Sequence, residues 1–229
     1  MIDIHSHVLP FVDDGSDDLQ KSLSMLKDCA LQGVTDVILT PHFRGEYKLD
    51  PEIIKEKFEA FKVSAKENGI DVNLYLGQEV NVHGDYKKFI ADGHVLTMNG
   101  TKYILVEFDY TKKTDVTEII YELVSMGYKP IAAHVERYSY IDLDTVYEIK
   151  DLGGLIEVNA ESIVGKHKRL YRKKIKEFFK HCLIDFVASD VHFDRVNYME
   201  KARDFVRKKY GSDAEYAVFN YNAEKIIKG

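Results

Sequence analysis

Short apolar runs alternate with amphipathic segments along the whole chain, and this alternation limits the possible folds more than any other feature. Seven runs are rich in Val, Ile and Leu, as strands buried on both faces are; they lie at 2–5, 34–40, 72–77, 103–108, 130–134, 155–159 and 184–189. Strands that alternate with helices build a parallel sheet. We therefore expect an α/β fold, a closed or nearly closed β/α barrel, with a doubly wound open sheet as the alternative.

Capping residues mark where the intervening helices begin and end. The cluster Ser16-Asp17-Asp18 predicts the start of a first helix that Gly33 ends, and Asp50-Pro51 predicts the start of a second that ends at Gly69. Further helices are expected at 114–126, 142–152, 168–181 and 196–209, with a loop over 81–100 that has room for one short helix. No linker or repeat interrupts the pattern, so residues 1–229 are expected to form a single domain.

Composition excludes several other classes of protein. The first residues lack a basic and apolar signal sequence, and no apolar stretch approaches the ~18 residues of a membrane span, so we expect a cytoplasmic protein without membrane insertion. A net charge of −6 disfavours nucleic acid as the partner. Cys29 and Cys182 suit a reducing compartment and are expected to be buried. Neither has the arginine six positions later that cysteine phosphatases need.

Metal-ligand side chains follow nearly every apolar run at the same end. His5 and His7 follow the first run, His42 the second, Glu79 the third, Glu107 the fourth, His134 the fifth, and Asp190 and His192 the seventh. The sixth run ends in Asn159. In a β/α barrel the carboxyl ends of the strands meet in one active site. Imidazole and carboxylate together suit Zn, Mn or Fe, and the pattern predicts a polynuclear metal site.

Each of these residues alone also has an ordinary structural explanation. A lone His134 could be a core histidine, and a single glutamate at a strand end could cap a helix or pair with a lysine. The joint pattern favours the metal site. We expect His83, His94, His167 and His181, which fall outside the strand ends, to lie on the surface.

The order of motifs resembles the polymerase-and-histidinol-phosphatase (PHP) superfamily, and within it the PHP-type tyrosine phosphatases of bacterial capsule and exopolysaccharide operons. The opening Met1 to His7, followed by Leu9-Pro10 and Asp13-Asp14-Gly15, carries the resemblance first. The segments Thr40-Pro41-His42, Gly77-Gln78-Glu79-Val80, Val106-Glu107-Phe108, Ala133 to Tyr138 and Ser189-Asp190-Val191-His192 then fit in order. The resemblance covers essentially the whole chain. Phe11 departs from it, because the family often has glycine there, and this departure could alter substrate entry.

The resemblance implies a distorted seven-stranded TIM-like barrel of PHP type with three divalent metal ions, most often Mn²⁺. By position, the ligands would be His5, His7, Asp14, His42, Glu79, Glu107, His134, Asp190 and His192. Glu107 is expected to bridge two ions. Arg137 and Arg195 resemble the arginines that contact phosphate, and His42 and Asp14 are further candidates for the catalytic chemistry. For Arg137 the alternative is a local ion pair with Glu136 or Asp142, and for Arg195 a surface role.

The resemblance also implies a function, which is the metal-dependent hydrolysis of phosphotyrosine. The expected partner is a bacterial tyrosine kinase with a tyrosine-rich tail that regulates capsular or exopolysaccharide biosynthesis. A small-molecule phosphatase, such as a histidinol phosphatase, is the alternative. An amidohydrolase would need a bridging lysine where this chain has Glu107, and the full set of ligands disfavours a non-catalytic binding module.

One charged run stands apart from the strand ends. Residues 166–174 contain Lys166, Lys168, Arg169 and several further cations. Because Tyr171 and Ile175 begin an apolar stripe at helical spacing, the run is expected to form the solvated face of a helix. A docking patch for an acidic or phosphorylated chain is the alternative.

Overall fold

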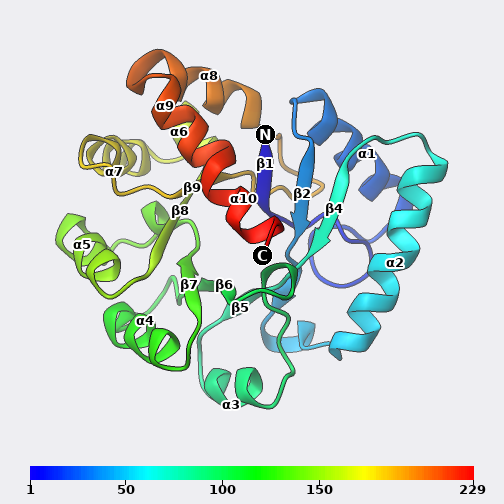
Figure 1. Cartoon of the computed structure of the whole chain (residues 1–229), viewed down its shortest axis with the longest axis horizontal. Coiled ribbons are helices and arrows are strands. Elements are labelled where there is room, and N and C mark those ends of the chain that lie inside the picture. Colours follow the sequence, from blue (N-terminus) through cyan, green and yellow to red (C-terminus); the bar gives the residue numbers. More distant parts are fainter.

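The computed structural model describes residues 1–229, and its strands form a curled, all-parallel barrel (Figure 1). The strands are β1 (Ile2–Ser6), β2 (Asp36–Leu39), β3 (His42–Phe43), β4 (Asn73–Leu76), β5 (Glu79–Asn81), β6 (Tyr103–Glu107), β7 (Lys129–Ala132), β8 (Leu155–Asn159) and β9 (Phe186–Ala188). All their pairings are parallel. The ring closes where the His7 amide donates to the Val191 carbonyl and the Asp190 amide to the His5 carbonyl. The predicted seven-stranded barrel is thereby confirmed, and the open sheet is excluded.

Two of the predicted strands are each divided into a longer and a shorter piece. The run expected at 34–40 becomes β2 and β3, which are separated at Pro41, a residue with no amide hydrogen to donate. The run expected at 72–77 becomes β4 and β5. A side chain at Gly77 would meet the Met98 sulfur at 2.8 Å, so the chain bends there against η2 (Met98–Gly100). These two bends distort the barrel, and the short strands β3 and β5 beyond them were not predicted.

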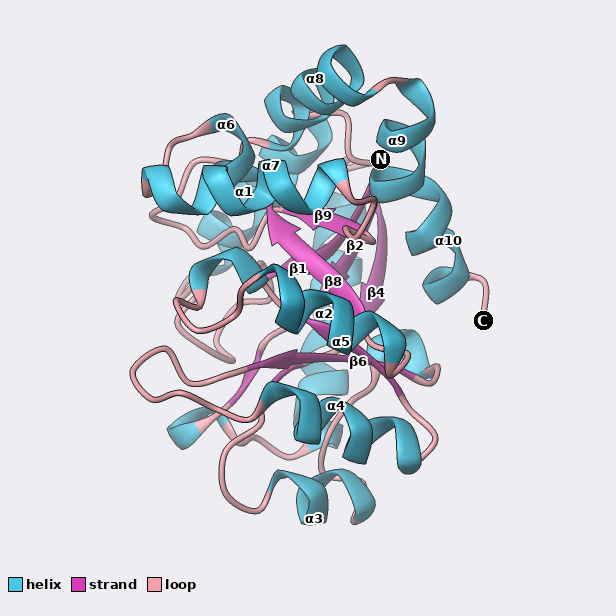
Figure 2. Cartoon of the chain, turned by 90° about the vertical axis from the view of Figure 1, so that its left-hand side faces the viewer, coloured by secondary structure: helices cyan, strands magenta, loops and turns pink.

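Helices surround the strands on the outside, as Figure 2 shows. They are α1 (Leu19–Leu31), α2 (Pro51–Glu67), α3 (Tyr86–Ala91), α4 (Val116–Ser125), α5 (Leu143–Asp151), α6 (Ala160–Val164), α7 (Arg169–Lys180), α8 (Met199–Tyr210), α9 (Ser212–Tyr216) and α10 (Asn222–Ile227), with short helical turns η1 (Gly45–Tyr47), η3 (Val135–Arg137) and η4 (Ala217–Tyr221). The predicted caps are confirmed, because Asp18 accepts from the Lys21 amide and Asp50 from the Glu52 amide. No helix has the length and apolar character of a membrane span.

The apolar core has an outer and an inner part. A larger cluster fills the space between the strands and the helices, and a smaller one lies inside the barrel around Ile2, Ile4 and Leu105. Ala223 and Ile226 of α10 belong to the inner cluster. In Figure 1 α10 crosses the middle of the barrel, so it closes the end at which the strands begin. The opposite end, where the strands finish, is free to hold a site.

A bulge in β1 directs its two histidines into the barrel. The pairing of β1 with β2 is regular at Asp3 and shifts before Ser6. In an uninterrupted strand neighbouring side chains alternate between faces, so His5 would face away from Ile4. Between Asp3 and Ser6, β1 has one residue more than the paired segment of β2. This extra residue interrupts the alternation and turns the His5 side chain toward the interior of the barrel. The buried Asp3 carboxylate stabilises the bulge, because it accepts from the amides of His5 at 3.4 Å and Ser189 at 3.0 Å.

The burial of the two cysteines and of the four histidines outside the strand ends can be compared with the predictions. Cys29 is buried as predicted, but Cys182 is exposed, so the prediction was wrong for this residue. Cys182 has a left-handed backbone (φ 53°) in the turn after α7, where its side chain points away from the core. His83, His94, His167 and His181 are all exposed, as predicted.

Candidate metal centre

The nine predicted ligand side chains converge at the carboxyl end of the barrel. Their ligand atoms form four overlapping groups, each with all of its atoms within 4.8 Å of one another: His7, Asp14, His42 and His192; His5, His7 and Asp190; His5, Glu79 and His134; and His42, Glu79 and Glu107. Eight of the nine residues are buried, and Asp14 alone is exposed. The residues therefore meet in space although they are spread over the chain from residue 5 to residue 192.

Histidine side chains form the middle of the cluster. The Nε2 atoms of His5 and His7 lie 3.2 Å apart, and each is 3.5 Å from Oε2 of Glu79. Asp190 Oδ1 lies 3.8 Å from His5 Nε2 and 3.6 Å from His7 Nε2. His192 stacks on His7, with ring centroids 4.2 Å apart. Several ring nitrogens thus point into one small space together with carboxylate oxygens.

Glu79 connects two parts of the cluster. Its Oε1 lies 2.8 Å from His134 Nε2, and its Oε2 lies 2.8 Å from His42 Nδ1. Glu107, the predicted bridge, belongs to one group only, with its Oε1 3.7 Å from His42 Nδ1. In the geometry of the side chains, Glu79 is the carboxylate best placed to be shared between two cations.

The chemistry of the cluster fits divalent metal ions. His42 Nδ1 and Glu79 Oε2 are buried and lie 2.8 Å apart, but they are not aligned for a hydrogen bond and have no other hydrogen-bond partner. An unpartnered buried polar atom is costly. A cation between such atoms would remove that cost. Five imidazoles and four carboxylates without any thiolate form a donor set that suits Mn, Fe or Zn.

Burial and neighbouring charges shift pKa values within the cluster, and two of its histidines are shifted toward the neutral form. Burial lowers the pKa of His7 well below its ordinary value, and the neighbouring His192 and His42 lower it further. It also lowers the pKa of His134, against the opposing effect of Glu79. Both rings are therefore neutral at pH 7, which is the form that binds metals. Burial, together with the nearby Glu79 carboxylate, raises the pKa of Glu107 to about 7.

Buried carboxylates outside the cluster orient its histidines. Asp13 Oδ2 lies 2.7 Å from His7 Nδ1 and accepts from the His42 amide at 3.0 Å, and Asp13 Oδ1 accepts from the Gly15 amide. Glu157 Oε2 lies 3.3 Å from His5 Nδ1. Such contacts fix the tautomer and direction of a ligand ring. Neither role was predicted, although Glu157 is the only charged residue in the apolar run at 155–159.

Gly15 allows the loop after β1 to fold back onto the cluster. A Cβ at this position would lie 2.1 Å from the His7 carbonyl oxygen and 2.3 Å from the His7 Cβ. Only glycine permits that approach. The motif Asp13-Asp14-Gly15 thus combines a carboxylate that holds His7, a candidate ligand and a close backbone contact.

The two predicted arginines lie side by side at the rim of the cluster. Arg137 and Arg195 donate to Asp190 Oδ2 at 2.9 and 3.0 Å, and Asn159 donates to the same oxygen at 2.9 Å. Arg137 therefore pairs with neither of the local acids considered above. Arg44, which was not predicted, donates to Asp14 Oδ2 at 3.0 Å and to Glu107 Oε1 at 3.4 Å. Three guanidinium groups thus border the cluster.

An open cavity of about 550 Å³ leads to the Glu107 side of the cluster. Arg44, Tyr47 and Tyr110 are among the residues that line it. The Tyr47 ring lies 6.4 Å from the His42 ring, nearly parallel to it, and the Tyr110 hydroxyl is 3.1 Å from His134 Nδ1. The residue Tyr110 is 41% exposed. The cavity therefore offers aromatic surface and positive charge next to the candidate ligands.

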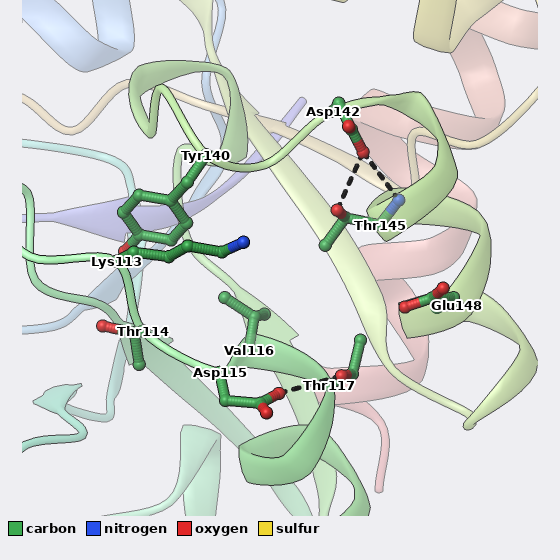
Figure 3. A pocket seen from close by; sticks show the side chains of 9 residues that line it. All are labelled: Lys113, Thr114, Asp115, Val116, Thr117, Tyr140, Asp142, Thr145 and Glu148. Atoms are coloured by element: carbon green, nitrogen blue, oxygen red, sulfur yellow. Dashed lines mark hydrogen bonds between the residues drawn. The ribbon is translucent and has the colours of Figure 1, made fainter.

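A second hollow, drawn in Figure 3, lies between the starts of α4 and α5. Its polar side chains already serve as helix caps: Asp115 accepts from Thr117 Oγ1, and Asp142 accepts from the amide and hydroxyl of Thr145. None of the nine candidate ligands lines it. The candidate functional site is therefore the cluster and not this hollow.

Three non-glycine residues near the cluster have left-handed backbones: His134 (φ 35°), Asp190 (φ 48°) and Phe11 (φ 62°). Such conformations are unfavourable by about 1–3 kcal/mol each and persist where the surrounding structure enforces them. At His134 and Asp190 the cluster is that surrounding structure. Phe11 occupies the position where the resemblance leads one to expect glycine.

The fold and the site together define a β/α-barrel hydrolase with a His/Asp/Glu metal-type centre at the carboxyl ends of its strands. The sequence matches, over residues 1–228, the family described as "Capsular polysaccharide synthesis, CpsB/CapC". The chain belongs to this family, so the predicted relationship is confirmed.

Similar proteins agree with this assignment. The tyrosine-protein phosphatase YwqE of Bacillus subtilis is 31% identical, over 100% of this chain and 92% of that protein. The tyrosine-protein phosphatase CpsB of Streptococcus pneumoniae is 31% identical, over 99% of this chain and 98% of that protein. A solved structure, from work on YwqE and CpsB as metal-dependent tyrosine phosphatases, matches with a TM-score of 0.92 and 31% identity, over 100% of this chain and 94% of that chain.

More distant structures share the fold alone. The histidinol phosphate phosphatase of Lactococcus lactis matches with a TM-score of 0.59 at 12% identity, over 91% of this chain and 94% of that chain. An organophosphorus hydrolase of Deinococcus radiodurans matches with a TM-score of 0.63 at 10% identity, over 99% and 92%. Both support the TIM-like barrel.

Proposed function

We propose that this chain is a metal-dependent protein tyrosine phosphatase, a phosphoric monoester hydrolase that removes phosphate from phosphotyrosine in a protein substrate. The observation that carries the proposal is the convergence of nine imidazole and carboxylate ligands with arginines beside an open cavity. Relatives that cover the whole chain are named tyrosine-protein phosphatases, which supports the same reaction.

The finer assignments are part of the proposal. Three Mn²⁺ ions would be held by His5, His7, Asp14, His42, Glu79, Glu107, His134, Asp190 and His192, all within one domain that spans residues 1–229. The protein would act in the cytoplasm on a tyrosine kinase with a tyrosine-rich tail that controls capsular or exopolysaccharide biosynthesis. The family description, which refers to capsular polysaccharide synthesis, supports this setting.

Bound divalent cations would supply positive charge for the phosphoryl oxygens and acidify a water molecule at the site. The chain's own groups do the positioning. Arg137 and Arg195 can each direct paired N–H donors at phosphate oxygens, because a guanidinium group is planar and forked. Asp190 holds both arginines beside the cluster before substrate arrives. His42 and Asp14, whose Nε2 and Oδ1 atoms lie 3.4 Å apart at the exposed side, would hold a cation there and contribute to the chemistry through it.

The cavity favours phosphotyrosine in a polypeptide over a small phosphate ester such as histidinol phosphate. Tyr47 and Tyr110 line the cavity and give it aromatic surface, which suits the phenyl group of phosphotyrosine. Because the cavity is open, the polypeptide on either side of the phosphotyrosine can remain outside. A histidinol phosphatase, the alternative, would need to enclose a small substrate.

The decisive experiment combines metal analysis of the purified protein with hydrolysis of a phosphotyrosine peptide. Wild type and His134→Ala are compared with and without added Mn²⁺. Two or three metal equivalents, with Mn²⁺-stimulated phosphate release that the variant loses, are the expected result. Faster turnover of histidinol phosphate than of the peptide would move the assignment to small phosphate esters. Absence of both metal and turnover would overturn the proposal.

A further inference from the structure

An exposed, strongly basic segment borders the mouth of the barrel between α6 and α7. Residues 166–176 include seven lysines and arginines and no acidic residue, in a chain whose net charge is −6. Lys166, Lys168 and Arg169, which we call the basic rim, lie at its start and are all exposed. The positive charge is therefore concentrated at one place on an otherwise acidic protein.

The chain path places the basic rim close to Arg137 and Arg195, the two arginines proposed to contact phosphate. Asn159, at the end of β8, contacts the same Asp190 oxygen as Arg137 and Arg195. The five-residue helix α6 follows at once and ends at Gly165 (φ 77°). Five helical residues advance the chain by about 7.5 Å, and the two residues that follow add at most about 7.6 Å, so the rim begins within roughly 15 Å of Asn159.

Packing of α7 fixes that position. The helix lies beside α6, outside β8 and β9 (Figure 1), and it packs against η3, the turn that carries Arg137. Lys174 of α7 donates to the carbonyls of Tyr138 and Ile141, the latter at 2.7 Å, which ties the helix to the segment after η3. The rim also lies within the electrostatic field of the two arginines. Partial burial lowers the pKa of His167, which lies between Lys166 and Lys168, and the charges of Arg137 and Arg195 lower it further.

The ordinary explanation of a basic run does not account for the rim. A helix exposes charged residues on its solvent face, and Tyr171, Ile175 and Phe178 do form the buried stripe of α7. However, Lys166 and Lys168 precede the helix. None of the three rim cations forms an ion pair within the chain, although acidic residues outnumber lysines and arginines by 38 to 32.

We propose that the basic rim binds acidic side chains that flank the phosphotyrosine in a polypeptide substrate. The inference rests on the proposed function and adds a sequence preference to it. An extended peptide advances about 3.3 Å per residue, so Asp or Glu about three to five residues from the phosphotyrosine would reach the rim. Exposed charge pairs of this kind strengthen encounter and binding and leave the chemical step unchanged.

The test uses two phosphotyrosine peptides that differ only in three flanking residues, Glu in one and Gln in the other. Wild type is compared with Lys166→Gln/Lys168→Gln/Arg169→Gln and with a control of equal charge change, Lys62→Gln/Lys66→Gln/Lys225→Gln. Lys62 and Lys66 lie beside the start of β4 and Lys225 lies in α10, so the control removes exposed lysines from the opposite end of the barrel. KM, kcat and hydrolysis of p-nitrophenyl phosphate are measured at low and high salt.

For wild type at low salt we expect a KM roughly fivefold lower for the Glu peptide than for the Gln peptide, since each exposed pair contributes a modest amount. The rim variant should reduce this ratio to about one, and high salt should do the same. Values of kcat and of p-nitrophenyl phosphate turnover should not change, and the control should behave as wild type.

A wild type that hydrolyses both peptides with equal KM would overturn the inference and leave the proposed function intact. An equal loss of preference in the control would also overturn it, because net charge alone would then explain the effect. Rim-dependent binding to anionic phospholipid vesicles, with no change in the peptide KM ratio, would assign the rim to a membrane surface instead. Failure of wild type to hydrolyse any phosphotyrosine peptide would overturn the proposed function itself.

Discussion

At the scale of single residues, much of the site depends on groups that hold the candidate ligands in place. Asp13 contacts His7, His42 and Gly15 at once, and it is not itself among the metal-type groups. Its two oxygens accept from three nitrogen atoms, so no uncharged isostere can replace all of these bonds. The role of Asp13 in the site is therefore testable by a change of one atom.

The substitution Asp13→Asn should weaken metal binding by about 10- to 100-fold, because an amide nitrogen would face the His7 ring and the His42 amide. Titration of the apo-protein with Mn²⁺ measures the change. Asp17→Asn is the matched control, since the Asp17 side chain is 81% exposed and pairs only with Lys21. Equal Mn²⁺ affinity in Asp13→Asn and wild type would contradict the positioning role.

Gly15 gives a second prediction at this scale. In Gly15→Ala the new methyl group would overlap the His7 backbone, so the loop after β1 must shift. We expect a loss of about 1–3 kcal/mol in the free energy of unfolding, together with reduced metal content. Gly84→Ala is the control, because Gly84 has a positive φ but open space around it. This control should lose stability only through backbone strain and should keep its metal.

At the scale of elements, the sequence predicts what periodicity and caps determine and misses what tertiary contacts determine. The helix starts at Asp18 and Asp50 follow from local hydrogen bonds, so they were predictable. The bulge in β1 was not predictable, because it depends on a hydrogen bond that the amide of Ser189, far away in the chain, donates to the Asp3 carboxylate. Likewise, β3 and β5 are too short to show a periodic pattern and exist only through pairing with their neighbours.

The candidate site divides in the same way. The predicted ligands stand at strand ends, where the architecture itself brings them together, so their meeting could be foreseen. Arg44 and Tyr110 reach the cluster from loops whose paths no pattern indicates. The helix α10 was also missed, because its position against Ile2 and Ile4 results from packing inside the barrel and not from a strong periodic signal.

The role of α10 leads to a prediction for that element. Ile226 is fully buried in the inner cluster, and Asn99 donates to its carbonyl at 3.3 Å. Ile226→Ala should lower the free energy of unfolding by about 2–4 kcal/mol, as other large-to-small core changes do. Because α10 closes the end of the barrel opposite to the site, metal content and kcat should not change. Ile53→Ala, at a residue that is 45% exposed, should lower the free energy of unfolding by less than about 0.5 kcal/mol, as measured by chemical denaturation.

At the scale of the whole molecule, apolar packing at one end of the barrel stabilises the fold, and buried charged groups are concentrated at the other end. The inner cluster and α10 fill the first end with apolar side chains. The second end buries adjacent carboxylates, Glu79 and Glu107, among histidines with unpartnered polar atoms. Without cations this end should be the less favourable part of the fold. Stability of the whole protein is therefore expected to depend on metal.

Removal of metal with EDTA should lower the melting temperature, and re-addition of Mn²⁺ should restore it. A ligand at 100 times its dissociation constant stabilises the folded state by about 2.7 kcal/mol, which for a chain of this size corresponds to roughly 5–10 °C. Differential scanning calorimetry of the apo- and Mn²⁺-loaded protein measures the shift.

His134→Ala removes one ligand-type side chain from the group it forms with His5 and Glu79, so its Mn²⁺-dependent shift should be smaller than that of wild type. Ile226→Ala should retain the full shift from a lower starting temperature, because the packing end and the charged end contribute independently. A melting temperature that does not respond to EDTA in a protein shown to have lost its metal would contradict this division.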